Sequence, residues 1–343
     1  MDIEELKNRI LGLPDADRAR LLREVGDVGP GPSSPGAQES RRHLLDNMMG
    51  NCPHCSHAKY VRFGKDKGAQ RYKCRSCKRS FTEYTGTWMA GLHKKDKIDA
   101  YLALMLEEKS LDKIKEALKI NKKTAFDWRH KILSSLGDGG EDDFTGITES
   151  DETFFLNSEK GNRNIVRKPR QRGGAPGKRG IDDEHVAVIV TRDRKSTMDL
   201  TVATMGRIKK SDIEGAIGGR IKKGKAVLCS DAHVSYKGFA MDNQLEHHAL
   251  KGIIKQRVKQ GVYHIQHVNS THNRVKKWLD STFWGVSTKY LQQYLDWFRV
   301  KEQLKGSRDL LRDFVAKTVE SVGAHEKYGN INDRYQNLIS TQT

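Results

Sequence analysis

The spacing of hydrophobic residues changes character along the chain. Residues 94–137 carry apolar side chains at helical intervals, broken so that three helices are expected. A helical pattern returns from residue 269 to residue 322. Between these regions the apolar residues gather in short runs rich in β-branched side chains, which predict strands at 147–155, 185–191, 198–205 and 225–230. The pattern therefore predicts a helical module followed by an α/β domain.

The chain divides into several expected domains. Helical spacing on both sides of Leu13-Pro14 predicts a helical arm, and the Pro/Gly/Ser-rich run 29–38 predicts a flexible linker after it. The expected divisions are an N-terminal arm at 1–28, a linker at 29–48, a cysteine module at 49–90, a helix-turn-helix at 94–137, an α/β domain at 145–300 with a basic, Gly-rich insertion at 157–180, and a helical tail at 301–343.

The chain is strongly basic. Its 62 Lys and Arg residues against 44 Asp and Glu residues give a net charge of +18. A positive field of this size attracts polyanions, so nucleic acid is the first partner that we expect, and a soluble basic protein without such a partner is the alternative. No apolar run approaches the roughly 18 residues that a membrane span needs, and residues 1–23 lack the apolar core of a secretory signal. We therefore expect a cytoplasmic, nucleoid-associated protein that does not bind membranes.

Four of the five cysteines form two closely spaced pairs. The pairs are separated by 18 residues, within the roughly 15–20 that are typical of a zinc ribbon. Strands with a turn at 64–68 are expected between them, so that each pair directs two thiolates at one ion. Because four cysteines leave no open position for a substrate, we expect a structural Zn²⁺ site. Its ligands would be Cys52, Cys55, Cys74 and Cys77.

Residues 110–132 have the pattern of a helix-turn-helix. Residues 110–118 predict a capped helix, residues 119–121 a short turn, and residues 122–132 a second helix. In such a motif the second helix enters the major groove, with its first residues near the base edges. The candidates for contact with phosphates or bases are Lys122, Lys123, Thr124 and Arg129. The alternative is a three-helix bundle without a role in DNA binding.

Two aspartates lie in or at the end of expected strands. Asp151 is embedded in the β-type run 148–155, and Asp231 ends the apolar run 227–230, just before an expected helix at 234–241. Burying a carboxylate is costly unless a metal ion or another cation pairs with it. Two aspartates from one sheet can share divalent ions, the arrangement of two-metal phosphodiester chemistry. The alternatives are an Asp151 that faces solvent on an edge strand and an Asp231 that caps the following helix.

The order of these motifs resembles one protein family. The cysteine module, the helix-turn-helix, the strand at 150–155, the turn at 230–233 and the late helix that opens at 267–269 follow one another as in the ISXO-type insertion-sequence transposases, the family numbered fifteen ninety-five. The resemblance covers about residues 50–300. It implies an RNase H-like mixed-sheet catalytic domain of the DDE type, with Asp151 as the first catalytic aspartate and Asp231 as the second.

The resemblance also implies cofactors and partners. The catalytic ions would be Mg²⁺ or Mn²⁺, and the partner would be double-stranded DNA, both the transposon ends and the target. A homodimer or a higher homo-oligomer would hold the two ends. The expected activity is recognition of the terminal inverted repeats of an insertion sequence, cleavage at its ends, and joining of the 3′-OH ends to target DNA.

The third acid of the family is replaced in this chain. Many relatives have a glutamate three residues after the Asn of the His-x-Asn motif, where this chain has His272. Imidazole is a poorer ligand for Mg²⁺ than a carboxylate is, and it suits Mn²⁺ or other transition ions better. We expect His272 to be the third ligand, with Asn269 and Asn273 as rivals. The alternative is that His272 lies on a DNA-facing helix without binding an ion.

Basic residues follow His272 on the same expected helix. Lys276 lies four residues further on, so both side chains share a helix face. The candidates for holding DNA phosphate here are Arg274, Lys276 and Lys277. Two other functions stay open: a catalytically inactive, transposase-derived DNA-binding protein, or a zinc-ribbon transcription regulator. The intact pair Asp151 and Asp231 favours the enzyme.

Overall fold

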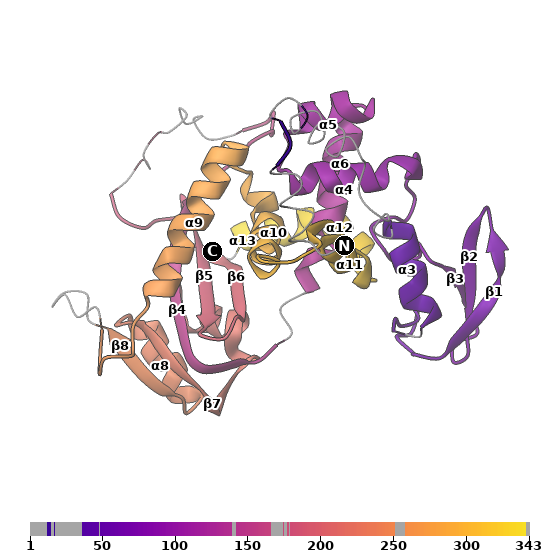
Figure 1. The fold of residues 1–343 in the computed structure, drawn as a ribbon. Coiled ribbons are helices and arrows are strands. Elements are labelled where there is room, and N and C mark those ends of the chain that lie inside the picture. The colour runs from indigo at the N-terminus through magenta and orange to yellow at the C-terminus, as the bar shows by residue number, and fades with distance from the viewer. Residues whose placement is uncertain are drawn as a thin grey trace.

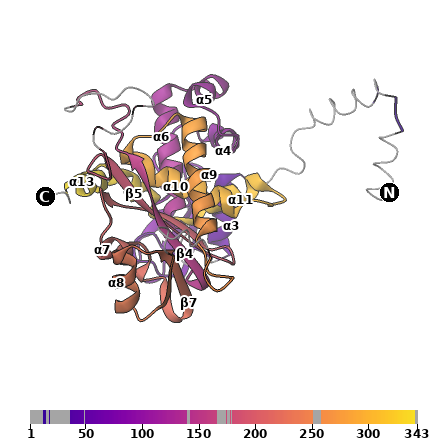
Figure 2. The ribbon, with the colours of Figure 1, turned by 90° about the vertical axis from the view of Figure 1, so that its left-hand side faces the viewer.

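The structure of the chain is a computed structural model (Figures 1 and 2). It describes residues 12–14, 17, 36–47, 49–138, 142–165, 174, 177, 179–250 and 258–340. Most of the expected N-terminal arm at 1–28 and part of the basic insertion at 157–180 lie outside the described residues. In the part of the chain that is described, no helix is long and apolar enough to cross a lipid bilayer.

The cysteine module is a three-stranded antiparallel sheet. It consists of β1 (Tyr60–Asp66), β2 (Ala69–Cys74) and β3 (Ser80–Thr82), in that order. Tyr60, Tyr72 and Phe81 pack against one another on one face of this sheet. The β1–β2 turn is tighter than the expected turn at 64–68, because Lys67 and Gly68 both have positive φ and form a two-residue hairpin.

A helix lies where the sequence analysis expected a linker at 29–48. Residues Ala37–Asp46 form α3, which begins after Gly36. Its buried stripe is Ala37, Arg41 and Leu45, and the Arg41 guanidinium donates to the Val319 carbonyl at 2.9 Å. An arginine at the centre of the buried stripe hid the amphipathic pattern, so the linker prediction is wrong for these residues.

Three helices occupy the region of the expected helix-turn-helix. They are α4 (Ile98–Leu106), α5 (Leu111–Leu118) and α6 (Lys122–Leu133). The Ser110 hydroxyl caps α5, and the Asn121 side chain caps α6 by accepting the Thr124 N–H at 2.6 Å. Lys119 adopts a left-handed conformation between the two helices. The three-helix prediction for this region is confirmed.

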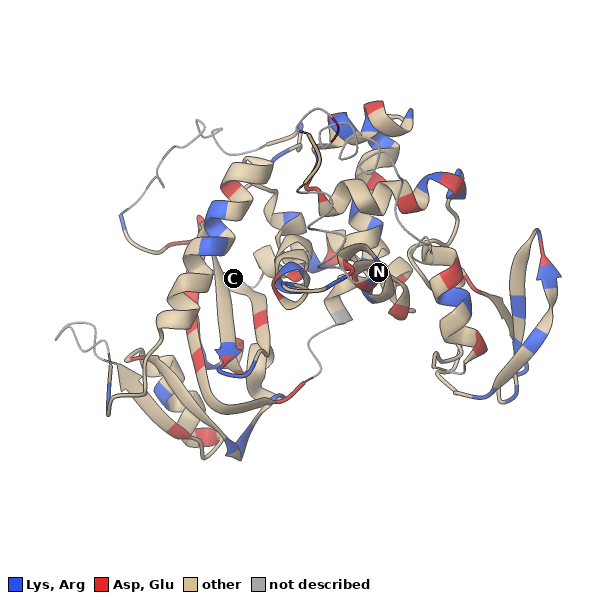
Figure 3. Cartoon of the chain, viewed as in Figure 1, with Lys and Arg blue, Asp and Glu red and all other residues tan. Residues whose placement is uncertain are grey.

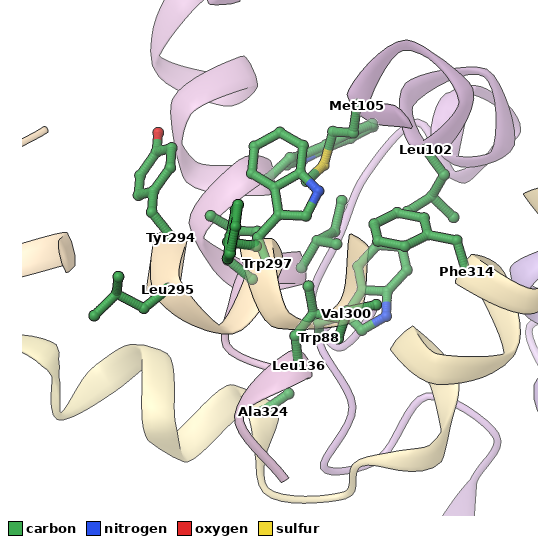
Figure 4. Close-up of a cluster of buried hydrophobic side chains, with 14 of the residues drawn as sticks. Trp88, Leu102, Met105, Leu136, Tyr294, Leu295, Trp297, Val300, Phe314 and Ala324 are labelled. Carbon is green, nitrogen blue, oxygen red and sulfur yellow. The ribbon is translucent and has the colours of Figure 1, made fainter. Parts of the chain in front are cut away.

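These helices share a hydrophobic core with the C-terminal helices. Those are α10 (Leu291–Gln303), α11 (Leu310–Glu320), α12 (Ala324–Gly329) and α13 (Ile331–Ser340). Figure 4 shows Trp88, Leu102 and Met105 packed near Trp297 and Phe314. Most of the expected tail that the structure describes, residues 301–340, is therefore helical. Its helix α11 belongs to the core that supports α4 and α6.

The second sheet is mixed and has five strands. The strands are β4 (Phe144–Leu156), β5 (His185–Asp193), β6 (Met198–Met205), β7 (Ile221–Asp231) and β8 (Glu246–Leu250). Their order is β6-β5-β4-β7-β8, with β6, β5 and β4 antiparallel and β4, β7 and β8 parallel. This is an RNase H-like arrangement, as expected. β8 has the sequence Glu-His-His-Ala-Leu, which contains no apolar run, and the sequence analysis missed this strand.

Helices cover both faces of the five-stranded sheet. On β5, Val186, Val188 and Val190 face one core, whereas Ala187 and Ile189 face the other. The first core includes α9 (Gln266–Phe283), which lies along β4 and β5 in Figure 1. The second includes α8 (Val234–Asp242). Burial on two sides explains why β5 is a continuous apolar run.

The remaining described helical segments are short. They are Lys95–Lys97, Leu136–Asp138, α7 (Lys210–Ile213), Glu214–Gly218 and Thr288–Tyr290.

Arg129 does not lie on the surface of α6. It is 2% exposed, its Nη2 donates to the Lys109 carbonyl at 2.6 Å, and its guanidinium lies 5.7 Å from the centre of the Trp297 ring. The side chain faces the junction with α10, because α6 buries one side against the C-terminal helices. Arg129 is therefore a core residue, and the sequence-based assignment of Arg129 to DNA contact is corrected.

Replacing Arg129 tests this structural role. Arg129→Ala should lower the free energy of unfolding by about 2 kcal/mol or more, because it removes a charged hydrogen bond and buried packing. The matched variant Lys123→Ala, at an exposed position of the same helix, should change it by less than about 0.5 kcal/mol. Denaturant unfolding measures both. An Arg129→Ala protein as stable as the wild type would contradict the assignment.

Candidate metal centres and nucleic-acid interface

The four cysteines converge on one point. Their sulfur atoms all lie within 4.8 Å of one another. Both pairs use the same local backbone: the N–H groups of Cys52 and Cys74 donate to carbonyls five residues later at 3.0 Å, and the residues after the second cysteines, Ser56 and Lys78, have positive φ. The repeated turn directs the sulfur atoms of each pair to the same side.

The sulfur geometry fits a zinc ion. The Cys52 and Cys77 sulfurs are 3.8 Å apart, and the Cys55 and Cys74 sulfurs are 3.7 Å apart. Four thiolates at about 2.3 Å from a central zinc would be separated by about 3.8 Å in a tetrahedron. The group can therefore bind Zn²⁺ in the expected way.

A second group lies in the large sheet, where β7 ends beside the middle of β4. β4 and β7 are parallel neighbours, with Glu149 paired to Cys229. Asp151 and Asp231 follow two residues later on each strand, so their side chains share a face. Carboxyl oxygens of Asp151, Glu152 and Asp231 lie within 4.8 Å of one another. The structure thus brings the two predicted aspartates together and adds Glu152, which the sequence analysis had not assigned.

The electrostatics of the Asp151, Glu152 and Asp231 group favour the binding of a cation. Burial, followed by the charges of Glu152 and Asp231, raises the pKa of Asp151 well above its usual range. Burial and then the charge of Asp231 also raise the pKa of Glu152. One Glu152 oxygen, Oε2, is buried without a hydrogen-bond partner among the described residues. Like charges held together and an unsatisfied oxygen fit a site for divalent ions with oxygen ligands.

His272 lies beside this group on α9. Its side chain is buried, and its pKa is lowered to about 4, first by burial and then by the charge of Lys276. The Asp151 backbone interacts with the imidazole and opposes that shift. Nε2 has no hydrogen-bond partner among the described residues. A neutral imidazole with an unsatisfied nitrogen is the ligating form of histidine, whereas the rivals Asn269 and Asn273 are exposed.

The other predicted role of Asp231 is only partly present. Its Oδ1 accepts the N–H of His233 at 3.0 Å. The N-cap of α8 is His233, whose side chain accepts the Ser235 N–H at 3.3 Å. Asp231 therefore shapes the turn before α8 while its carboxyl group stays within the acidic cluster.

Glu149 is a second acidic residue that the sequence analysis left unassigned. It is 1% exposed and contacts Arg194, His264 and His267. A signal was present in the sequence, because Glu149 and Asp151 alternate on one strand and therefore share a face. The partners of Glu149, however, come from the residue that follows β5 and from the start of α9 and the segment before it. Sequence spacing alone does not bring them together.

The predicted basic residues of α9 differ in their surroundings. Arg274 is half-buried and pairs with Glu302 of α10. Lys276 is half-buried, with its Nζ 5.8 Å from the centre of the Phe155 ring. Lys277 is exposed. Arg274 therefore ties α9 to α10, whereas Lys277 is open to a ligand.

The start of α6 is exposed. Lys122 and Lys123 face solvent, with Lys122 paired to Asp112 at 2.9 Å, and Thr124 is half-buried. A groove of about 1010 Å³ extends from Lys122 to the residues that follow α9, with Lys289 and Tyr290 in its lining. Figure 3 shows Lys and Arg on α9, on the α5–α6 region and along β1 and β2.

The chain combines a four-cysteine ribbon with an RNase H-like sheet on which three carboxyl groups converge. A family model described as the ISXO2-like transposase domain matches residues 143–302. This region is therefore similar to that family of transposase domains. The family resemblance of the sequence is confirmed for residues 143–302.

Comparisons of whole chains add little to this assignment. A comparison with curated proteins finds no match. Among solved structures, the chain is similar to the Mos1 strand transfer complex, with 13% identity, a TM-score of 0.21, and coverage of 62% of this chain and 78% of that chain. A pre-cleavage Mos1 transpososome gives 14% identity, a TM-score of 0.19, and coverage of 68% and 81%. Likenesses at these TM-scores carry no argument about function.

Zinc content tests the ribbon site. Cys52→Ser should abolish stoichiometric zinc and unfold the ribbon, because a small module with a metal centre draws much of its folding free energy from the ion. Elemental analysis and a colorimetric zinc-release assay measure the loss. Cys229→Ala is the matched control, since Cys229 is a buried cysteine outside the group, and it should keep its zinc. Full zinc retention in Cys52→Ser would refute the site.

Ion binding at the acidic cluster should depend on pH. Folding raises the pKa of the Asp151 carboxyl group, so the group stabilises the folded, ion-free protein at pH values below the pKa that the group has in the unfolded chain. This stabilisation is lost as the pH rises through the pKa that the group has in the folded protein. Asp151 must lose that proton to bind an ion, so the affinity for Mn²⁺ should increase with pH and binding should release protons. Calorimetry in buffers of different ionisation enthalpy measures both effects.

Variants define which carboxyl groups are responsible for this Mn²⁺ binding. Asp151→Asn and Asp231→Asn should each remove most of the binding. Asp242→Asn, an exposed position on α8, should leave it unchanged. Affinity that is independent of pH, or binding that survives both substitutions, would show that the ions bind elsewhere.

Proposed function

We propose that this protein is a DNA transposase of an insertion sequence. It binds the terminal inverted repeats, cleaves at the element ends and joins the 3′-OH ends to target DNA. The observation that carries the proposal is the convergence of Asp151, Glu152 and Asp231 within 4.8 Å, inside a region that matches a transposase domain. Fold alone would not support a reaction, whereas this cluster has the chemistry for one.

The acidic cluster and His272 would hold the divalent ions. Asp151 and Asp231 would be the main ligands, Glu152 adds an unsatisfied oxygen within their cluster, and His272 adds an unsatisfied nitrogen from α9. When bound, such ions supply a water or 3′-hydroxyl nucleophile and stabilise the leaving oxygen of a phosphodiester. An imidazole ligand favours Mn²⁺ over Mg²⁺.

The reaction needs no external energy source. In cleavage, a water oxygen forms a bond to phosphorus while the bond from phosphorus to the 3′-oxygen of the element end breaks. In joining, this 3′-oxygen attacks a target phosphodiester, and the 3′-oxygen of the target strand leaves. The number of phosphodiester bonds is unchanged in the joining step. The residues of the chain bind and orient the strands and hold the ions.

Three basic regions support the binding of double-stranded DNA. Lys122 and Lys123 lie at the start of α6, where a recognition helix meets base edges and phosphates. The second region is on the ribbon, where Arg71 and Lys73 of β2 lie over the Phe63 ring. The third is Lys277 on α9. Recognition of the ends is assigned to the ribbon and α6, and a homodimer or higher homo-oligomer would hold both ends.

A strand-transfer assay tests the proposal. Pre-cleaved ends, taken from the inverted repeats that flank the gene, should be joined to a plasmid by the wild-type protein, more efficiently in Mn²⁺ than in Mg²⁺. Asp151→Asn and Asp231→Asn should reduce joining by at least about 100-fold, or about 2.7 kcal/mol of barrier. Both variants should still bind end DNA, because the basic regions are unchanged.

The same assay separates the other functions. Asp242→Asn is the matched carboxylate control and should join ends at the wild-type rate. Specific binding of the ends without any joining in either metal would instead indicate an inactive, transposase-derived DNA-binding protein. Specific binding to promoter DNA, but not to the ends, would indicate a zinc-ribbon transcription regulator.

A further inference from the structure

Glu149 is the most buried of the acidic residues near the proposed active site. It lies on β4, two residues before Asp151, and its side chain is 2% exposed. It is not part of the cluster of Asp151, Glu152 and Asp231. Burying a carboxylate costs free energy of desolvation, and this cost is offset only when hydrogen-bond or ionic partners replace the water around the carboxylate.

The partners of Glu149 lie at the start of α9. Its Oε2 accepts the backbone N–H of His267 at 2.9 Å and that of Val268 at 3.3 Å. Its Oε1 accepts from Nδ1 of His267 at 2.7 Å. The first N–H groups of a helix have no partner within the helix, and α9 has no cap from its own N-cap side chain. Glu149 of β4 therefore caps the N-terminus of α9, and its negative charge interacts favourably with the positive end of the helix dipole.

A metal ion is an alternative partner for Glu149, because ligand atoms of Glu149, His264 and His267 lie within 4.8 Å of one another. The Arg194 guanidinium already occupies this position. Its Nε donates to Glu149 Oε1 at 3.1 Å, and its Nη2 donates to the Val262 carbonyl at 2.8 Å. A fixed cation on the same oxygen repels a metal ion, and both oxygens already accept hydrogen bonds. The contacts are those of an anchor for α9.

The distance between Glu149 and Asp151 along β4 is close to the distance between Val268 and His272 along α9. Glu149 and Asp151 are two residues apart on β4, which is about 6.6 Å along a strand. Val268 and His272 are four residues apart on α9, which is about 6 Å along a helix. α9 packs on β4. Fixing Val268 at Glu149 therefore brings His272 level with Asp151.

We propose that Glu149 is a positioning residue, which anchors the first turn of α9 on β4 and so holds His272 at the ion site formed by Asp151 and Asp231. This inference rests on the proposed function, because it assumes that His272 binds the catalytic ion. Glu149 itself touches neither the ion nor the DNA. Loss of the anchor should leave the carboxylate ligands in place and release the histidine.

Pulsed electron paramagnetic resonance of bound Mn²⁺ tests the proposal without DNA and without activity. An imidazole ligand gives a nitrogen hyperfine coupling that carboxylate ligands do not. The wild type should show it, His272→Ala should lose it, and Glu149→Ala should lose it while still binding Mn²⁺ with an affinity about 10–100-fold weaker. Zinc content and circular dichroism report whether each variant is folded.

Glu302→Ala is the matched control. Glu302 pairs with Arg274 and thus also ties α9 to a neighbour, but beyond His272 in the sequence. It should keep the nitrogen coupling. Should Glu149→Ala fail to fold, Glu149→Gln takes its place, because it keeps one oxygen for the helix N–H groups but loses the charge. It should give a smaller fraction of nitrogen-coupled Mn²⁺ than the wild type.

The outcomes distinguish this inference from the proposed function. Nitrogen coupling that is lost in His272→Ala but fully kept in the folded Glu149 variant overturns the positioning role alone. Equal loss in Glu149→Ala and Glu302→Ala also overturns it, since any loosening of α9 would then suffice. A wild type without nitrogen coupling overturns the role of His272 as a ligand and the inference with it, whereas strand transfer by Asp151 and Asp231 would be unaffected.

Discussion

Carboxyl groups that are buried side by side repel one another, and this repulsion is the constraint on which the proposed active site depends. β7 ends at Asp231 beside the middle of β4, and the parallel register of the two strands brings Asp151 and Asp231 to one face. The raised pKa of Asp151 is the energetic consequence, with burial as the main cause and the neighbouring charges next. A divalent ion removes both costs, because it replaces water as the partner of the carboxylates and lies between their charges. The ionised cluster therefore destabilises the fold without a bound ion, and a divalent ion offsets this cost.

The rest of the domain keeps this cluster in place from both sides. β5 lies beside β4 and is buried on two faces, so the centre of the sheet has little freedom to move. α8 packs on one face through Tyr236 and Phe239. α9 packs on the other face and carries His272 on its buried side. An active site on rigid strands and a packed helix keeps its ligands at fixed positions, which catalysis by bound ions requires.

The basic surfaces are connected to the same framework. Arg129 joins α6 to the Lys109 carbonyl, between α4 and α5, and to Trp297 of α10. Arg41 joins α3 to α11. Both are arginines whose charge is used inside the protein, although the chain is highly basic overall. The exposed cations, Lys122, Lys123 and Lys277 among them, are those that remain for a polyanion. Net charge alone therefore overstates how many basic side chains are available for DNA.

The sequence by itself determined the ribbon cysteines, the three helices that follow the ribbon, four strands of the RNase H-like sheet and the pair Asp151 and Asp231. These features are local, because they depend on motif spacing or on the periodicity of one segment. Only the tertiary structure decided that Glu152 joins the cluster, that Glu149 meets the start of α9, and that Arg129 and α3 are buried. Each of these depends on residues that are distant in the chain and are brought together by packing, and no local pattern encodes which face of a helix or strand meets which partner.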